Sequence, residues 1–135
     1  MPNKTYAKEW LVKVYHDIGS AKILYESGHY TDSIGVDLHY AIEKLLKTFL
    51  AYENKSIPKI HDLPKLYELV KEYISFEEDE ENILYVANKY HIEMSYPVFE
   101  SSLPEKEEIK EVLDFSQKLL DRVCSMLDIK KEELK

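Results

Sequence analysis

Cysteine, glycine and proline are scarce in this 135-residue chain, which holds one cysteine, three glycines and five prolines. Because one cysteine cannot pair within a chain, no disulfide framework supports the fold, and the apolar spacing around Cys124 indicates a small core residue. No apolar run approaches the ~20 residues of a membrane-spanning helix, and the polar N-terminus differs from a secretory signal. We therefore expect a cytoplasmic protein.

Positive charge is also in short supply. Eighteen Lys and Arg residues stand against 26 Asp and Glu residues, and the formal net charge is −8. This balance argues against a free-standing nucleic-acid binder held by bulk electrostatics. Glycine-rich phosphate-binding motifs are missing, which excludes a phosphate cradle of that kind. The length predicts a single domain over residues 1–135, large enough to bury a core of its own.

The first half of the chain predicts two long helices. No proline interrupts residues 3–57, and apolar residues recur at spacings of three and four. The pattern predicts helices over 6–26 and 31–53, antiparallel to each other. Gly28 separates them, because glycine readily adopts the left-handed conformation that follows a helix end.

Capping signals divide the second half into three further helices. Asp62 suits an N-cap, since Pro64 then falls in the first turn. Ser75–Glu78 and Ser102–Glu105 each match a capping box. The three predicted helices cover 63–74, then the stretch from 77 through Tyr90 that breaks before Pro97, and finally 105–127. No segment alternates with period two, so the sequence predicts an all-α bundle of about five helices.

The predicted helix over 31–53 is apolar around half of its circumference. Its main stripe consists of Leu38, Ile42, Leu45, Phe49 and Tyr52. Leu46 and Leu50 add a second apolar edge. One neighbouring helix would not cover both, so we expect this helix to be central in the bundle or to form a dimer seam.

Polar side chains lie beside that second edge and form the candidate site. His39 and Glu43 are one turn apart, and polar groups beside a core need partners or a function. The candidate ligand-binding residues are His39, Glu43, Lys47, His61 and Tyr96. Lys47 would take a phosphate, while Glu43 and His61 would bond a base or ribose. In the structural alternative, Glu43 pairs with Lys47 at i+4 and His61 pins the following loop to this helix.

Metal binding has weaker support in the sequence. Ferritin-like sites require Glu-x-x-His pairs on facing helices, but the one such spacing here, Glu26 to His29, spans the predicted break at Gly28, and no His-Glu-x-x-His motif is present. His39, Glu43 and His61 would be the only candidate ligands, with hydrogen bonding among them or to neighbouring groups as the alternative. We expect neither a metal nor a cofactor.

Three stretches of the chain resemble the HEPN domain family. They are YTDSIGVDLHYAIEKLLK from Tyr30, IHDLPKLYELV from Ile60 and YHIEMSYP from Tyr90, with the core Ala41, Glu43, Lys44, Leu46 and Lys47. The resemblance covers roughly residues 5–127. It implies an up-and-down helical bundle that usually dimerises and that often acts beside a minimal nucleotidyltransferase, as a toxin–antitoxin or substrate-binding pair.

The resemblance also implies a test for ribonuclease activity, because many family members use an Arg-x(4–6)-His motif. Here Arg122 is the only arginine and no histidine follows it, while Ser95-Tyr96-Pro97 stands where relatives often read Arg-Tyr-Pro. We therefore assign no catalytic residue and expect a non-catalytic homodimer that binds a nucleotide, a nucleotidyltransferase, or both. The alternatives are an RNA-cleaving, toxin-type ribonuclease with a rearranged site, using His39 or His91 with Glu43, and an assembly module that docks a partner protein.

Overall fold

The computed structural model describes residues 2–93, 97 and 103–135, and every regular element within them is helical. The elements are α1 (Lys4–Glu26), α2 (Thr31–Tyr52), α3 (Leu63–Val70), α4 (Glu78–Asn88), α5 (Tyr90–Glu93), α6 (Lys106–Leu127) and the 3₁₀ helix η1 (Lys131–Leu134). Within this part of the chain, no helix combines the length and hydrophobicity that a membrane crossing requires. The predicted all-α class is confirmed.

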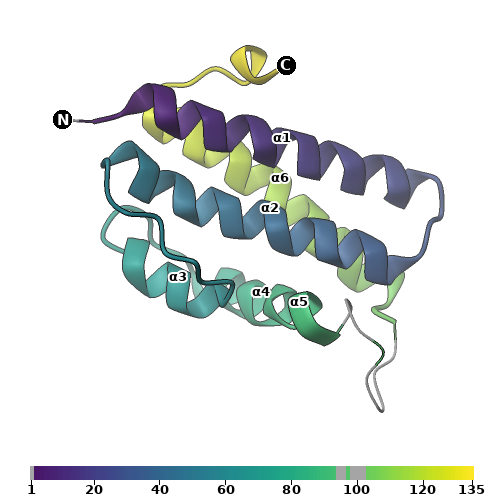
Figure 1. Cartoon of the computed structure of the whole chain (residues 1–135). Coiled ribbons are helices and arrows are strands. Elements are labelled where there is room, and N and C mark those ends of the chain that lie inside the picture. The colour runs from purple at the N-terminus through teal and green to yellow at the C-terminus, as the bar shows by residue number, and fades with distance from the viewer. Residues whose placement is uncertain (1, 94–96, 98–102) are drawn as a thin grey trace.

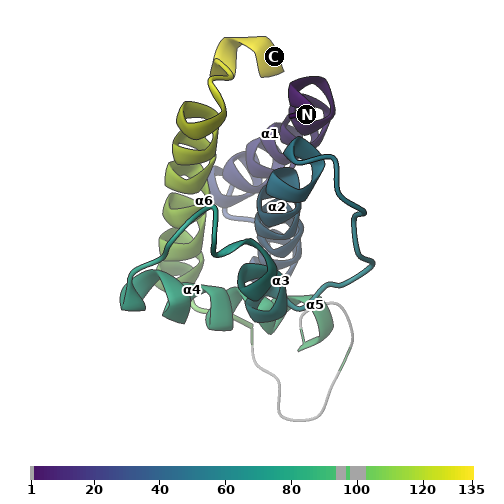
Figure 2. The same cartoon turned by 90° about the vertical axis from the view of Figure 1, so that its left-hand side faces the viewer.

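The helices form an up-and-down bundle around α2 (Figure 1). Helices α1 and α2 run antiparallel, α3 to α5 together lead the chain back along α2, and α6 then reverses direction. Viewed along the bundle, α1 and α6 lie on one side of α2, and α3 and α5 on the other (Figure 2). Helix α2 contacts every other α-helix.

The break between α1 and α2 follows the prediction. Gly28 has a φ of 70°, in the left-handed region, and the Gly28 amide donates to the Tyr25 carbonyl. At the other end of α1, the Asn3 side chain accepts a hydrogen bond from the Tyr6 amide at 3.0 Å. Such caps satisfy backbone groups that have no partner within the helix.

Both apolar faces of α2 are covered within the chain. Leu46 is fully buried and Leu50 is 6% exposed. The expectation of a central helix is confirmed, and the alternative of a dimer seam along the Leu46–Leu50 edge is wrong. The short helices α3, α4 and α5 pack against α2 on the side that α1 and α6 leave open, and this removes the apolar excess that suggested a seam.

A close approach of α5 to α2 depends on Gly35. A Cβ atom at this position would lie 3.0 Å from Cγ of the Tyr90 ring. The absence of a side chain therefore lets Tyr90, which is 2% exposed, pack directly on the α2 backbone. The Tyr90 hydroxyl donates to Oε2 of Glu108 on α6 at 2.6 Å, so one residue ties α5 to two long helices.

The short helices differ from the prediction at three points. Helix α3 ends at Val70 rather than 74, and α4 is capped by a box of Glu77 with Glu80 rather than by Ser75 with Glu78. The Phe76 amide donates to the Tyr67 hydroxyl at 2.9 Å. This tertiary contact holds the residues between α3 and Phe76 in a non-helical conformation. A turn at Lys89 then separates α4 from α5, which we expected to be continuous.

The last helix also begins differently. Glu105 is the N-cap of α6, whereas Ser102, the expected cap, lies outside the described residues. Beyond α6, Asp128 adopts a left-handed conformation with a φ of 56°, and the chain turns into η1. Leu134 of η1 is 1% exposed, so this unpredicted turn adds to the core.

Candidate functional site

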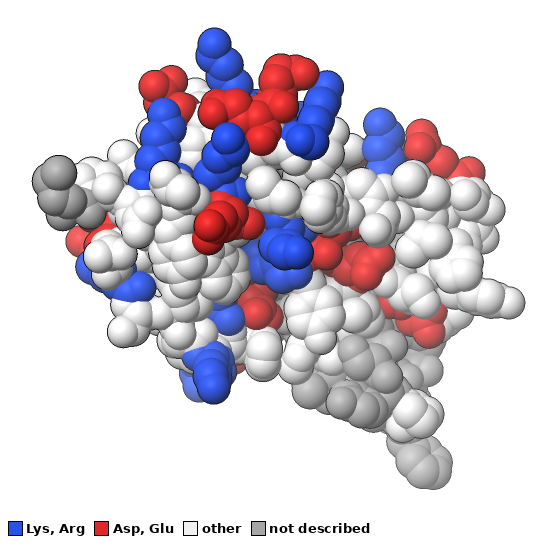
Figure 3. Space-filling model, turned by 45° about the horizontal axis from the view of Figure 1, so that its top comes forward, with Lys and Arg blue, Asp and Glu red and all other residues white. Residues whose placement is uncertain are grey.

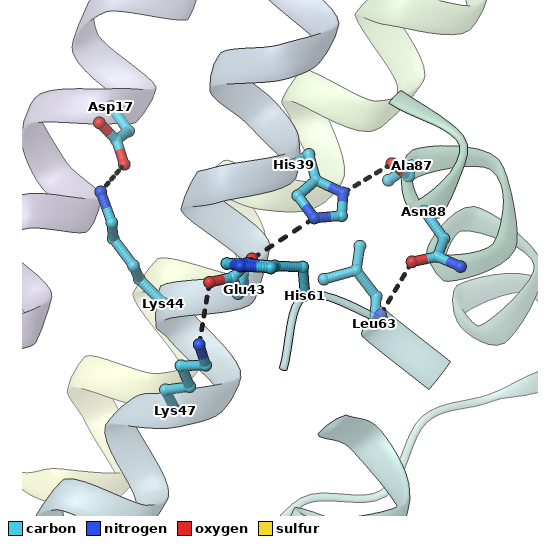
Figure 4. A network of polar contacts seen from close by, with 9 residues as sticks. All are labelled: Asp17, His39, Glu43, Lys44, Lys47, His61, Leu63, Ala87 and Asn88. Atoms are coloured by element: carbon cyan, nitrogen blue, oxygen red, sulfur yellow. Dashed lines mark hydrogen bonds and ion pairs between the residues drawn. The ribbon is translucent and has the colours of Figure 1, made fainter. Parts of the chain in front are cut away.

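The Glu43 carboxylate is the centre of a buried polar cluster on α2 (Figure 4). Its Oε1 accepts a hydrogen bond from Nδ1 of His61 at 2.9 Å, and its Oε2 accepts one from Nζ of Lys47, also at 2.9 Å. Both contacts of the structural alternative are present: Glu43 pairs with Lys47 across one helical turn, and His61 joins the loop before α3 to α2. A buried carboxylate requires such partners.

His39 is fully buried one turn before Glu43. Its Nδ1 lies 3.1 Å from the Ala87 carbonyl oxygen of α4. Because a carbonyl can only accept, Nδ1 must carry the proton of this bond. Nε2 lies 3.5 Å from Oε1 of Glu43, within ion-pair range, yet it has no hydrogen-bond partner among the described residues. The ring thus connects the Glu43 cluster to α4.

These neighbours determine the charge of Glu43. Burial alone would raise the pKa of the carboxyl group, because it penalises the charged form. The interactions with His39, His61 and Lys47 outweigh burial and lower the pKa from 4.5 to about 2. Glu43 is therefore ionised throughout the neutral and mildly acidic range.

The local sequence explains why His61 reaches this position. The Asp62 side chain caps α3 by accepting from the Lys65 amide at 3.1 Å, as predicted. The Leu63 amide donates to Oδ1 of Asn88 on α4 at 2.9 Å, which fixes the same end of α3 a second time (Figure 4). Leu63 itself is fully buried. With the next two residues held in this way, His61 is directed towards Glu43.

His91 of α5 completes a stack of three imidazole rings. Its centroid lies 5.0 Å from that of His39 and 4.6 Å from that of His61, with interplanar angles of 29° and 19°. Burial lowers the pKa of His91, and the charges of His39 and His61 lower it further, while Glu43 opposes them. The candidate binding set omitted His91, because only tertiary packing brings α5 against α2.

Tyr40 and Lys44 extend the cluster towards α1. The Tyr40 ring meets the His39 and His91 rings edge-on, at centroid distances of 5.9 and 6.0 Å. Lys44 Nζ lies 5.9 Å from the Tyr40 ring centroid and donates to Oδ2 of Asp17 on α1 at 2.7 Å. Next to this pair, burial and the Asp17 charge raise the pKa of Asp37, while Lys44 opposes them.

The candidate residues that were predicted from the sequence differ in solvent exposure. The His61 side chain is 49% exposed, whereas those of Glu43 and Lys47 are only 7% and 6% exposed. The Lys47 ammonium lies against Glu43 rather than on the surface. The structure therefore brings together His39, Glu43, Lys47 and His61, while Tyr96 lies outside the described residues.

Other chemistry-bearing groups have structural roles. Arg122 donates from Nη2 to the Ser75 carbonyl at 2.8 Å and lies 3.7 Å from Glu80, so it fastens the α3–α4 connection. Burial raises the pKa of the Cys124 thiol, as in an unreactive core cysteine. No group of three or more His, Cys, Asp or Glu side chains in the described ranges is arranged to hold a metal ion.

Charge on the face formed by α1 and η1 is mixed rather than basic. Figure 3 shows lysines and carboxylates side by side on this face. Lys8 lies 3.5 Å from Glu133, and Lys131 lies 2.9 Å from Asp121. This pairing leaves no broad single-sign surface there for a nucleic-acid backbone.

Comparison with known proteins identifies relatives in fold and sequence. The "HEPN domain" family profile matches residues 7–130. The crystal structure of TT1696 from Thermus thermophilus is similar, with a TM-score of 0.73, 23% identity, and coverage of 89% of this chain and 97% of that one.

A second solved structure, ST0689, described as an archaeal HEPN homologue, has a TM-score of 0.68 and 13% identity, and the match covers 90% of this chain and 97% of that one. No curated protein matches the sequence. These two structures are similar in fold, and the family profile spans nearly the whole sequence. The chain belongs to the HEPN domain family.

Proposed function

We propose that this HEPN domain is a non-catalytic module that binds a nucleotide, with the base stacked on the His61 ring. The observation that carries the proposal is the imidazole stack, which begins at the buried His39 and ends at the half-exposed His61. Proteins commonly bind unpaired bases by stacking them on accessible aromatic or histidine rings. The hydrogen bond to Glu43 orders His61 before a ligand arrives, which lowers the entropy lost on binding.

The phosphate of the nucleotide would be neutralised by surface lysines near His61. Lys59 precedes His61 by two residues and Lys65 follows it by four, and both are exposed. Lys47, the phosphate ligand that the sequence suggested, is instead engaged by Glu43. With a net charge of −8, the protein would attract a mononucleotide more readily than a long polyanion.

Titration calorimetry with AMP, GMP, ATP and GTP tests the proposal. Because base stacking contributes about 1–3 kcal/mol, His61→Ala should weaken binding by roughly 5- to 150-fold. His61→Phe preserves a ring and should retain more affinity than the alanine variant.

His29→Ala is the matched control, since His29 is also exposed and its ring lies 5.3 Å from that of Tyr30. It should bind like the wild type. Flat heats with all four nucleotides, or equal losses in the His29 and His61 variants, would refute nucleotide binding at this site.

We also propose that the protein is a cytoplasmic homodimer that works with a minimal nucleotidyltransferase, as in toxin–antitoxin pairs. Membership of the HEPN family supports this proposal. The dimer contact would use a surface other than the Leu46–Leu50 edge, which is buried within the protomer. Sedimentation velocity at tens of micromolar should give the mass of a dimer, and a single monomeric species would contradict it.

A ribonuclease with a rearranged site is the second candidate. It is favoured by the 5.0 Å contact between the His39 and His91 rings beside Glu43, since imidazoles and carboxylates are the usual general acids and bases. A sensitive RNA-cleavage assay separates the two functions. The non-catalytic proposal predicts no turnover, whereas cleavage by the wild type that is lost in His39→Ala would overturn it.

A further inference from the structure

The three stacked imidazoles come from separate segments, which makes their contact a junction between elements. His39 belongs to α2, His61 to the loop before α3, and His91 to α5. We propose that His91 is a pH-sensitive clasp: its neutral ring lies between those of His39 and His61, and in mild acid the protonated ring leaves the stack. The proposal concerns the free protein and does not depend on nucleotide binding.

The charged and titratable groups around His91 favour the neutral ring. Helix α2 presents His39, Tyr40 and Glu43 to it, and the loop before α3 presents His61. Helix α4 contributes the Ala87 carbonyl, which His39 already uses. Glu43 supplies the negative charge among these described neighbours, and its two oxygens already accept bonds from His61 and Lys47. Among the described residues, a proton on His91 would therefore gain no carboxylate partner of its own.

Like charges would also meet in the stack. A proton on His91 would place its charge between those of His39 and His61, both of which act against it. At centroid separations of 4.6 and 5.0 Å, cations in adjacent rings would repel each other strongly in this partly buried environment. Repulsion of this kind acts directly against the contacts of the His91 ring with His39 and His61.

The direction of the pKa shift sets the pH window. Burial, followed by the charges of His39 and His61, lowers the pKa of the stacked His91 ring from 6.5. The stacked form thus binds a proton less readily than the free form, so acid favours the free form. The stack is complete above pH 6.5 and loses stability as the pH falls below that value.

The neighbouring residue keeps α5 attached while His91 moves. The Tyr90 ring packs against Gly35, and its hydroxyl donates to Glu108 at 2.6 Å. Burial and the hydrogen bond to Glu108 raise the pKa of Tyr90, so acid leaves this anchor uncharged and intact. Departure of His91 would consequently uncover the His39 ring and one face of His61 without separating α5 from the bundle.

NMR of the histidine rings between pH 7.5 and 5.0 tests the clasp. The His91 Cε1–H resonance should titrate with a midpoint below 6.5, and its nuclear Overhauser contacts to His39 and His61 should disappear reversibly in acid. In the His91→Phe variant, the introduced ring carries no titratable group and should keep both contacts at pH 5.0. His29→Phe, which changes a histidine outside the stack, should leave the acid transition unaltered.

Two results would overturn the inference. Ring contacts that persist at pH 5.0 in the wild type would show that protonation does not open the stack, and an acid transition unchanged in His91→Phe would assign it elsewhere. If that variant fails to fold, His61→Phe replaces it. Because the His61 charge helps to lower the His91 pKa, this substitution should move the His91 midpoint upward, and an unmoved midpoint would also refute the clasp.

Discussion

The Glu43 carboxylate and the Lys47 ammonium form an ion pair of 2.9 Å across one turn of α2, with their side chains only 7% and 6% exposed. Glu–Lys pairs at this spacing ordinarily lie on helix surfaces and stabilise the helix slightly. Here both charged groups are buried, so each needs the other as an ion-pair partner to remain charged at low cost. The pair also fixes the carboxylate to which His61 donates, which connects the stability of α2 to the order of the candidate site.

Replacing Lys47 by methionine should destabilise the protein by about 3 kcal/mol, because it leaves Glu43 buried with only its histidine partners. Urea unfolding followed by circular dichroism measures the change. Lys110→Met is the matched control, since Lys110 and Asp114 form a 2.9 Å pair at the same spacing on the surface of α6. Losing that pair should change stability by less than about 1 kcal/mol. Equal effects of the two substitutions would show that the buried Glu43–Lys47 pair stabilises the protein no more than the surface pair does.

Glu43→Gln should make the free energy of unfolding less dependent on pH in the acid range. The folded-state pKa of Glu43 is about 2, against an ordinary 4.5, so its contribution is fully present above pH 4.5 and disappears as the pH falls towards 2. The difference corresponds to about 3 kcal/mol, which the variant lacks at neutral pH.

Urea midpoints at a series of pH values between 2 and 7 measure this effect. Glu111→Gln, an exposed position on α6, provides the comparison and should follow the wild-type curve. A Glu43→Gln variant whose stability falls in acid as steeply as that of the wild type would contradict the assigned pKa.

Gly35→Ala should destabilise the protein by about 1–3 kcal/mol, because a new Cβ would lie 3.0 Å from the buried Tyr90 ring. Gly19→Ala tests the same substitution in α1, where the added Cβ would have no described atom within 4 Å apart from the local backbone of α1 and the two adjacent residues. That change should stabilise the protein by about 0.5–1 kcal/mol through helix propensity. Thermal unfolding of both variants measures whether each substitution raises or lowers stability. Stabilisation by both would exclude a close α5–α2 contact.

Periodicity in the sequence was sufficient for the long helices. The spacing of apolar residues placed α1, α2 and α6 to within two residues at each end. The short helices were less predictable because tertiary contacts set their limits. The Tyr67 hydroxyl holds the Phe76 amide, and Arg122 holds the Ser75 carbonyl, neither of which a local pattern reveals.

The candidate site was also predictable only in part. His39, Glu43 and Lys47 share one face of α2 through their four-residue spacing, so their proximity followed from the sequence. His91 joins them only because α5 packs against α2, and the Ala87 carbonyl reaches His39 only through the packing of α4. The burial of the Leu46–Leu50 edge was likewise set by the short helices.

The binding of a base at His61 can be observed most directly in the histidine Cε1–H resonances during titration with AMP at pH 7.5. The proposed function predicts a saturable ring-current shift of the His61 resonance, with nuclear Overhauser contacts to the adenine protons. His16 and His29, which lie away from the stack, should not shift. If no histidine resonance moves at millimolar AMP, or if His16 and His29 move as far as His61, the central claim is wrong.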